Sequence, residues 1–200
     1  GREVDYFCGC GYLGFHGREE LIEAACQATR DFGIGSATSR RGFGNNPVLL
    51  EVERRAADFL GAEDALYFVS GYMGNTILLQ GLRDAYDVIF FDRESHYSVL
   101  DGVTLTERPA FAFSHRDPDS LKDQVRRRMK PTDRPLLICD GVFPVSGKVS
   151  PILDYIDVLQ EYQDFTICVD DAHALGVIGD NGRGCFEHLG ATGPQLHSSG

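Results

Sequence analysis

Residues 165–173 read FTICVDDAH, a mostly apolar run that ends in two aspartates and a histidine. A short apolar run bounded by polar residues is typical of a buried strand, and helical patterns separate several such runs along this chain. Strands that alternate with helices predict parallel βαβ units. We therefore expect an α/β fold with three layers, αβα, around a mostly parallel sheet. The expected strands are Ala65–Val69, Val88–Phe91, Ala110–Phe113, Leu136–Cys139 and Phe165–Val169, and the expected helices are Glu19–Arg30, Pro47–Leu60, Tyr72–Leu82, Tyr97–Leu105, Ser120–Met129 and Ile152–Tyr162.

Composition narrows the class of protein. The chain has 200 residues, 42% of them hydrophobic and 24% charged, which is ordinary for a globular protein. Its net charge of −11 argues against nucleic acid or an anionic membrane as the main partner. The sequence has no apolar run long enough to span a membrane and no signal-peptide pattern at its start. Six cysteines without C-x-x-C spacing favour a reducing compartment, and we expect a cytoplasmic protein with small-molecule ligands.

A literal G-x-G-x-x-G motif, Gly9–Gly14, follows a possible strand at Val4–Phe7 and raises the alternative of dinucleotide binding. The next helix is expected to start only near Arg18, so its N-terminus would not meet a phosphate at the glycines. The polar segment Gly33–Asn46 stands where the next strand should be. Nucleotide binding is therefore disfavoured, and Gly33–Asn46 is either a functional loop or a flexible connection.

The residues Asp170, Asp171 and His173 follow the last expected strand, where ligands bind in open α/β sheets. Asp170 could hold a cationic ring nitrogen, and His173 could contact a neighbouring oxygen. Two alternatives stay open. The acids could be solvated loop residues beside a capping histidine. Alternatively, an Asp and His173 could ligate a metal, which needs a third ligand, and His96 is the obvious candidate.

Two further segments follow expected strands. Ser70–Asn75 has glycine at a strand-to-helix turn, which can offer backbone N–H groups to an anion or can be an ordinary helix cap. His96, within Glu94–Ser98, can offer a flat ring, or it can belong to a helix start capped by Ser95. Together with Asp170 and His173, these features suit a planar, phosphorylated and protonated heteroaromatic ligand, pyridoxal phosphate (PLP).

The order of these motifs resembles that of the α-oxoamine synthases, which are PLP enzymes of fold type I. The similarity extends from about Asp5 to Gly200, and the combination of motifs is more specific than any one of them. The matching segments are Gly11–Gly14, Gly33–Ser36, Ser39-Arg40, Phe59–Gly61, Ser70–Asn75, Ser95–Ser98, Asp140–Phe143, Val169–His173 and Gly182–Gly184.

This resemblance implies a role for each matching residue. The backbone at Gly71 and Tyr72 would bind the cofactor phosphate, His96 would stack on the pyridine ring, Asp170 would pair with the ring nitrogen, and His173 would contact the ring hydroxyl oxygen. No metal is implied. The implied reaction condenses a small amino acid with an acyl-CoA or acyl-carrier-protein thioester, releases CO2 and yields an α-amino ketone. The resemblance also implies a homodimer.

The chain departs from the family pattern near the expected site. Pro144 stands where the family usually has a serine that contacts the cofactor, and Ser146 is a possible substitute. Leu49 replaces a histidine, and Ser146-Gly147-Lys148 replaces Asp-Gly-Asp, which reverses one charge. These departures leave the choice of substrate open.

The Schiff-base lysine of the family would lie shortly beyond Gly200, and none of Lys122, Lys130 and Lys148 follows the expected motif. We therefore expect the N-terminal part of a longer enzyme. Residues 1–32 would form an N-terminal segment and helix, and residues 33–200 the first part of the PLP-binding large domain, without the C-terminal small domain. The alternatives are another fold type I enzyme, such as an aminotransferase, or a non-catalytic partner subunit that lacks the lysine.

Overall fold

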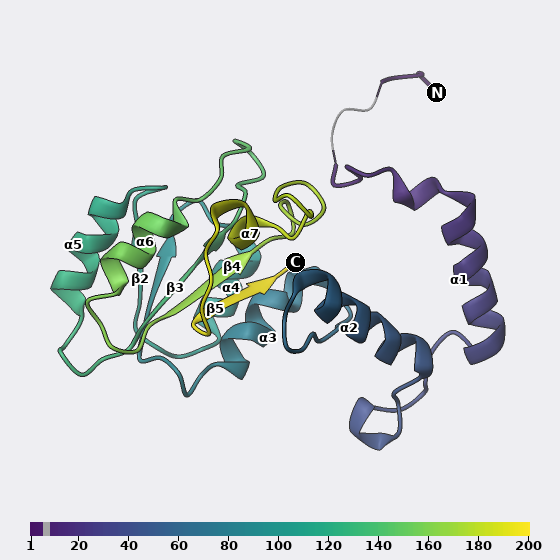
Figure 1. The fold of residues 1–200 in the computed structure, drawn as a ribbon, viewed down its shortest axis with the longest axis horizontal. Helices are drawn as coiled ribbons and strands as arrows, with labels where there is room; N and C mark the ends of the chain where they lie inside the picture. Colours follow the sequence, from purple (N-terminus) through teal and green to yellow (C-terminus); the bar gives the residue numbers. More distant parts are fainter. Residues whose placement is uncertain (6–8) are drawn as a thin grey trace. The chain divides into compact units, whose positions relative to one another are not determined.

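The computed structural model describes residues 1–5 and 9–200 (Figure 1). The chain divides into two compact units, Gly1–Tyr67 and Phe68–Gly200. No helix within the described residues is both long enough and apolar enough to cross a membrane.

The first unit contains two α-helices, α1 (Glu19–Phe32) and α2 (Pro47–Leu60), both close to the expected ranges. The start of α2 is fixed by its sequence, because the Asn46 side chain accepts a hydrogen bond from the Leu49 amide at 2.8 Å. Gly61 ends the helix in the left-handed conformation at φ 67°.

The glycines of the G-x-G-x-x-G motif do not open a helix that could face a phosphate. Gly14 precedes a short 3-10 turn, Phe15–Gly17, and α1 begins only at Glu19. The strand that we expected at Val4–Phe7 includes Tyr6 and Phe7, which lie outside the described residues. The geometry of Gly9–Gly14 therefore gives the dinucleotide interpretation no support.

The loop Gly33–Asn46 is anchored to α2 within the first unit. Arg40, in the 3-10 turn Arg40–Gly42, pairs with Glu53 through both guanidinium branches, one at 2.8 Å. The Glu53 carboxylate also accepts a hydrogen bond from the Tyr67 amide at 2.8 Å. The loop therefore has a defined attachment, although it has little regular secondary structure.

The second unit contains a five-stranded sheet in the order β2-β1-β3-β4-β5, in which every pair is parallel (Figure 1). The order reverses between β1 and β3, and such a switch point places a crevice at the carboxyl ends of the strands. This arrangement confirms the expected α/β class with a mostly parallel sheet and matches a fold type I large domain. The strands are β1 (Val88–Asp92), β2 (Ala110–Phe113), β3 (Pro135–Asp140), β4 (Thr166–Asp170) and β5 (Leu196–Ser199).

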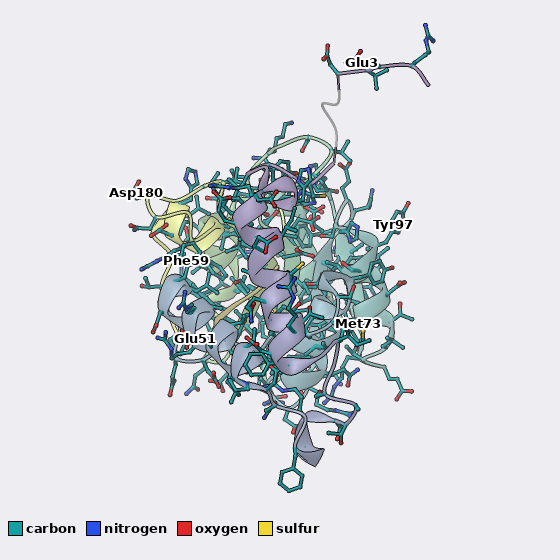
Figure 2. The ribbon with its side chains drawn as sticks, turned by 90° about the vertical axis from the view of Figure 1, so that its right-hand side faces the viewer. Glu3, Glu51, Phe59, Met73, Tyr97 and Asp180 are labelled. Carbon is teal, nitrogen blue, oxygen red and sulfur yellow. The ribbon has the colours of Figure 1, made fainter. Side chains whose placement is uncertain are left out.

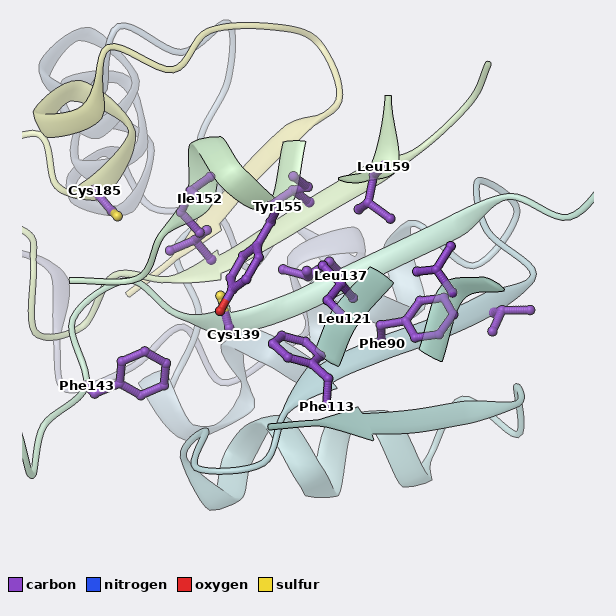
Figure 3. Packing of buried hydrophobic residues seen from close by; sticks show 14 residues of the cluster. Phe90, Phe113, Leu121, Leu137, Cys139, Phe143, Ile152, Tyr155, Leu159 and Cys185 are labelled. Carbon is purple, nitrogen blue, oxygen red and sulfur yellow. The ribbon is translucent and has the colours of Figure 1, made fainter. Parts of the chain in front are cut away.

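Helices cover both faces of the sheet because alternate strand residues point to opposite sides. On one face, Leu137 of β3 packs in a buried cluster with side chains of α5, α6 and α7, and the Phe113 and Tyr155 rings meet edge to face at 5.3 Å (Figure 3). On the other face, Leu136 and Ile138 pack with side chains of α3 and α4. The helices of this unit are α3 (Gly74–Gly81), α4 (Tyr97–Thr104), α5 (Pro118–Arg128), α6 (Ile152–Leu159) and α7 (Cys185–Leu189).

Three elements differ from the expectations. The prediction of a strand at Ala65–Val69 is wrong, because this segment forms no backbone hydrogen-bond ladder with the described strands. The segment is irregular, and Val69 is 89% exposed. The strand β5 and the helix α7 were not expected. β5 reads Leu-His-Ser-Ser and has too little apolar character to show a strand pattern, yet it pairs with β4 along its length.

Candidate active site

Three aspartates end three neighbouring strands at the carboxyl edge of the sheet. Asp92 ends β1, Asp140 ends β3 and Asp170 ends β4, and their residues are 0%, 2% and 9% exposed. Asp140 and Asp170 are paired in register across the two strands. A buried carboxyl group needs hydrogen-bond donors, and the donors around these three carboxyl groups define the site.

The fully buried side chain of Asn75 holds the Asp170 carboxyl group in place. Asn75, near the start of α3, donates from Nδ2 to Asp170 Oδ2 at 2.7 Å, and the Ala172 amide donates to Oδ1 at 3.1 Å. The same Asn75 nitrogen donates to Ser98 Oγ at 3.0 Å, while Asn75 Oδ1 accepts from Ser199 Oγ at 3.0 Å. One side chain thus joins α3, α4, β4 and β5 behind the candidate ring-nitrogen ligand.

His96 is the N-cap residue of α4. Its Nδ1 lies 2.8 Å from Ser98 Oγ and accepts a hydrogen bond from the Ser98 amide at 3.2 Å. Its backbone amide donates to Asp140 Oδ2 at 3.0 Å. The capping alternative therefore applies to His96 itself and not to Ser95. The capping contacts use Nδ1, and they also fix the orientation of the ring.

The turn before α3 lies next to His96. Gly71 and Tyr72 open the 3-10 turn Gly71–Met73, and the first amides of such a turn have no partner within it. The Tyr72 ring meets the His96 ring edge to face at 5.9 Å, and its hydroxyl donates to Asp101. Tyr97, at the start of α4, points outward and is 76% exposed (Figure 2). The expected anion turn and the expected flat ring are therefore neighbours.

Burial changes the acidity of Asp140. Removal from water, together with the nearby Asp170 carboxylate, raises its pKa to about 7, while the hydrogen bond from the His96 amide acts in the opposite direction. The edge of the sheet therefore holds a carboxyl group that changes charge near neutral pH, between His96 and Asp170.

Asp171 is a structural residue and not a solvated loop acid, which was one of the alternatives open from the sequence. It is 1% exposed and accepts a hydrogen bond from the Cys185 amide at the start of α7, at 3.2 Å. Burial raises its pKa to about 7. His173 lies in the turn that follows β4 and is half-buried.

The departures at Pro144, Ser146 and Lys148 lie in one loop after β3, whereas Leu49 belongs to α2. Residues 142 and 149 form an isolated antiparallel bridge, and Gly147 turns the chain at φ 66°. Pro144, Ser146 and Lys148 are all exposed in this loop. Within residues 1–5 and 9–200, no three His, Cys, Asp or Glu side chains are grouped closely enough to hold a metal ion.

The structure brings Asp170 and His96 together through Asn75 and Ser98, and it places Tyr72 against His96. Asn75, Ser98 and Asp140 had no role expected from the sequence. The signal available for Asn75 was a polar residue at the start of a helix with an apolar centre, and such a residue is rarely buried without a specific partner.

The donor set fits the group expected from the sequence. The Asp170 carboxyl group is buried, the His96 imidazole is linked to it through Asn75 and Ser98, and a Cβ at Gly71 would meet nothing within 4 Å. These are the contacts that PLP needs from a protein: a partner for its ring nitrogen, a ring packed on its face and amides for its phosphate.

Comparison with known proteins gives the class that this fold and site define. Residues 9–196 match the family model "Aminotransferase class I and II", and the chain belongs to this family of PLP-dependent enzymes. Among similar sequences, a putative 8-amino-7-oxononanoate synthase of Syntrophotalea carbinolica is 39% identical over 98% of this chain and 51% of its own length. The 8-amino-7-oxononanoate synthase of Geotalea daltonii is 35% identical over 100% of this chain and 53% of its own.

Solved structures agree with this assignment. A serine palmitoyltransferase from S. paucimobilis with a bound PLP–myriocin aldimine superposes with a TM-score of 0.84, at 29% identity, over 92% of this chain and 46% of its own. The 8-amino-7-oxononanoate synthase of Francisella tularensis gives a TM-score of 0.73, at 26% identity, over 92% of this chain and 49% of its own. The chain thus spans about half the length of these relatives.

Proposed function

We propose that this protein is part of a PLP-dependent acyltransferase of the α-oxoamine synthase type. It would condense a small amino acid with an acyl-CoA or acyl-carrier-protein thioester and release CO2 to give an α-amino ketone. The observation that carries the proposal is the buried hydrogen-bonded group in which Asn75 joins Asp170 to Ser98 and, through it, to His96.

Each expected site residue has a proposed task. The amides of Gly71 and Tyr72 would bind the phosphate, Asp170 would hold the ring nitrogen, His96 would pack on the ring face, and His173 would contact the ring hydroxyl oxygen. When it is bound, the cofactor supplies an electron sink for bond cleavage at the α-carbon of the amino acid. A carboxylate next to the ring nitrogen favours the protonated ring on which this chemistry depends.

Two assays test the proposal. Equilibrium dialysis with PLP measures binding directly, and we expect saturable binding that is at least tenfold weaker in Asp170→Ala. In the second assay, small amino acids labelled at the carboxyl carbon are incubated with PLP, the complete enzyme and an acyl thioester. We expect labelled CO2 and free thiol in equal amounts. Formation of a 2-oxo acid without CO2 would contradict the synthase and favour an aminotransferase.

One observation favours a second candidate, a non-catalytic partner subunit. Pro144 cannot supply the hydroxyl contact that the resemblance assigns to its position, and it is exposed in the loop after β3. Replacement by the family residue, Pro144→Ser, distinguishes the two. An active protein whose rate changes with this substitution supports the enzyme, whereas a protein that is inactive in both forms but binds PLP supports the subunit.

We further propose a homodimer in the cytoplasm, in which residues 33–200 form the first part of the PLP-binding domain. The net charge of −11 and the free thiols of the five described cysteines support the cytoplasm. The mass of the particle in solution, measured by light scattering, tests the dimer.

A further inference from the structure

We propose that Asn75 is a positioning residue that holds the Asp170 carboxylate and, through Ser98, sets which ring nitrogen of His96 carries the proton. The role of this relay in cofactor binding rests on the proposed function, whereas the relay itself rests on the hydrogen bonds around Asn75.

The orientation of the Asn75 amide is determined by its partners. A carboxylate only accepts hydrogen bonds, so the Asn75 atom at 2.7 Å from Asp170 Oδ2 must be the nitrogen. The Ser199 hydroxyl then donates to Asn75 Oδ1 at 3.0 Å. Asn75 is fully buried, and both protons of its amide are committed, one to Asp170 and one to Ser98.

This orientation determines the direction of the next bond. Since Ser98 Oγ accepts a hydrogen bond from Asn75, its own proton is free to point at His96 Nδ1, 2.8 Å away. The Ser98 backbone amide also donates to Nδ1, at 3.2 Å. Two donors aimed at Nδ1 require an unprotonated nitrogen there, so the ring proton lies on Nε2.

The consequence concerns the two residues that would contact the cofactor ring. Asn75 keeps one Asp170 oxygen in place, and the same amide fixes the proton arrangement of His96. A change at Asn75 therefore affects both residues together, although Asn75 itself is covered by protein.

The most informative variant is Asn75→Asp, which keeps the size of the side chain and removes both donors. The new carboxylate would accept a hydrogen bond from the Ser98 hydroxyl, so Ser98 Oγ would then accept a hydrogen bond from a protonated His96 Nδ1. It would also face Asp170 at a distance where two carboxylates repel each other. We expect the His96 proton to move to Nδ1 and the dissociation constant of PLP to rise at least tenfold.

The experiment is long-range proton–nitrogen NMR of the complete protein labelled with 15N-histidine, in which His96→Gln assigns the signals. We expect Nε2–H in the wild type, Nδ1–H in Asn75→Asp, and a mixture of both forms in Ser98→Ala. Ser98→Ala serves if Asn75→Asp does not fold. The matched control is Ser150→Ala, another buried hydroxyl, which contacts Cys139 outside this network. It should keep the wild-type signal.

The outcomes separate this inference from the proposed function. A wild-type His96 that carries its proton on Nδ1, or a signal that Asn75→Asp and Ser98→Ala both leave unchanged, overturns the relay. A signal that moves as expected in a protein that does not bind PLP supports the relay and contradicts the proposed function. Equal PLP affinity in wild type and a folded Asn75→Asp refutes the role of the relay in binding.

Discussion

Substitution of Asp140 by asparagine should stabilise the protein at alkaline pH and leave its stability nearly unchanged at acid pH. Asp140 is 2% exposed, and burial together with the Asp170 carboxylate raises its pKa from the ordinary value of 3.8 to about 7. Because the folded state holds this proton more tightly than the unfolded chain, the contribution of Asp140 to stability is complete below about pH 4. It is lost as the pH rises through about 7.

The size of the effect follows from the shift in pKa. A shift of about three units, at about 1.4 kcal/mol per unit, corresponds to about 4 kcal/mol between the two ends of the pH range. Asparagine has nearly the shape of the protonated acid, and its oxygen can still accept the hydrogen bond from the His96 amide. Asp140→Asn should therefore raise the free energy of unfolding at pH 8.5 by up to about 4 kcal/mol.

Urea unfolding followed by circular dichroism at pH 4, 6 and 8.5 measures this difference. The control is Asp180→Asn, a substitution of an exposed loop residue, which should change stability by less than about 0.5 kcal/mol at each pH. If Asp140→Asn were less stable than the wild type at pH 8.5, or if its effect did not depend on pH, the burial argument for this carboxyl group would be refuted.

Other substitutions test the fold around the site. Gly184→Ala would place a Cβ 2.5 Å from Asp171 Oδ2 at φ 89° and should lower the free energy of unfolding by about 2–3 kcal/mol. Gly147→Ala, at φ 66° but in open space, should lower it by about 1 kcal/mol. Equal losses of stability in thermal unfolding would contradict the contact with Asp171. Leu137→Ala in the fully buried cluster should cost about 2–5 kcal/mol in urea unfolding, and a loss below 1 kcal/mol would refute tight packing there. Asn46→Ala should cost about 1 kcal/mol through loss of the cap of α2, seen as lower helicity by circular dichroism.

Much of the second unit could be predicted from the sequence because its strands are buried on both faces. Runs such as Leu136–Cys139 are apolar throughout, and the structure extends this strand by one residue at each end, to Pro135–Asp140. The helix expected from Ser120 is also present, although α5 begins two residues earlier, at Pro118, where the Asp117 side chain caps it by accepting from the Ser120 amide at 3.0 Å.

The failures have physical causes. The segment Ala65–Val69 has the composition of a strand, but composition cannot supply a partner, and the segment pairs with no described strand. β5 shows the opposite case. Its own sequence does not predict a strand, but it becomes one because its backbone pairs with the edge of β4. The helix α7 is five residues long and depends on a distant residue, Asp171, for the contact at its start.

The candidate site was predictable in part. Asp170 and His96 could be proposed because they follow strands, and strand ends are where such folds bind ligands. The hydrogen-bonded link between them could not be predicted, because it passes through Asn75, which lies 95 positions from Asp170 in the sequence. A hydrogen bond between residues so far apart depends on the tertiary fold and leaves no local pattern.

The dissociation constant of PLP, measured by equilibrium dialysis, tests whether this edge of the sheet holds the cofactor. We expect saturable binding of one PLP per chain by the wild type and by Asp180→Asn, and binding at least tenfold weaker in Asp170→Ala and His96→Ala. Absence of binding by the folded wild type, or equal affinity in Asp170→Ala, would contradict the assignment of this edge of the sheet as a PLP site.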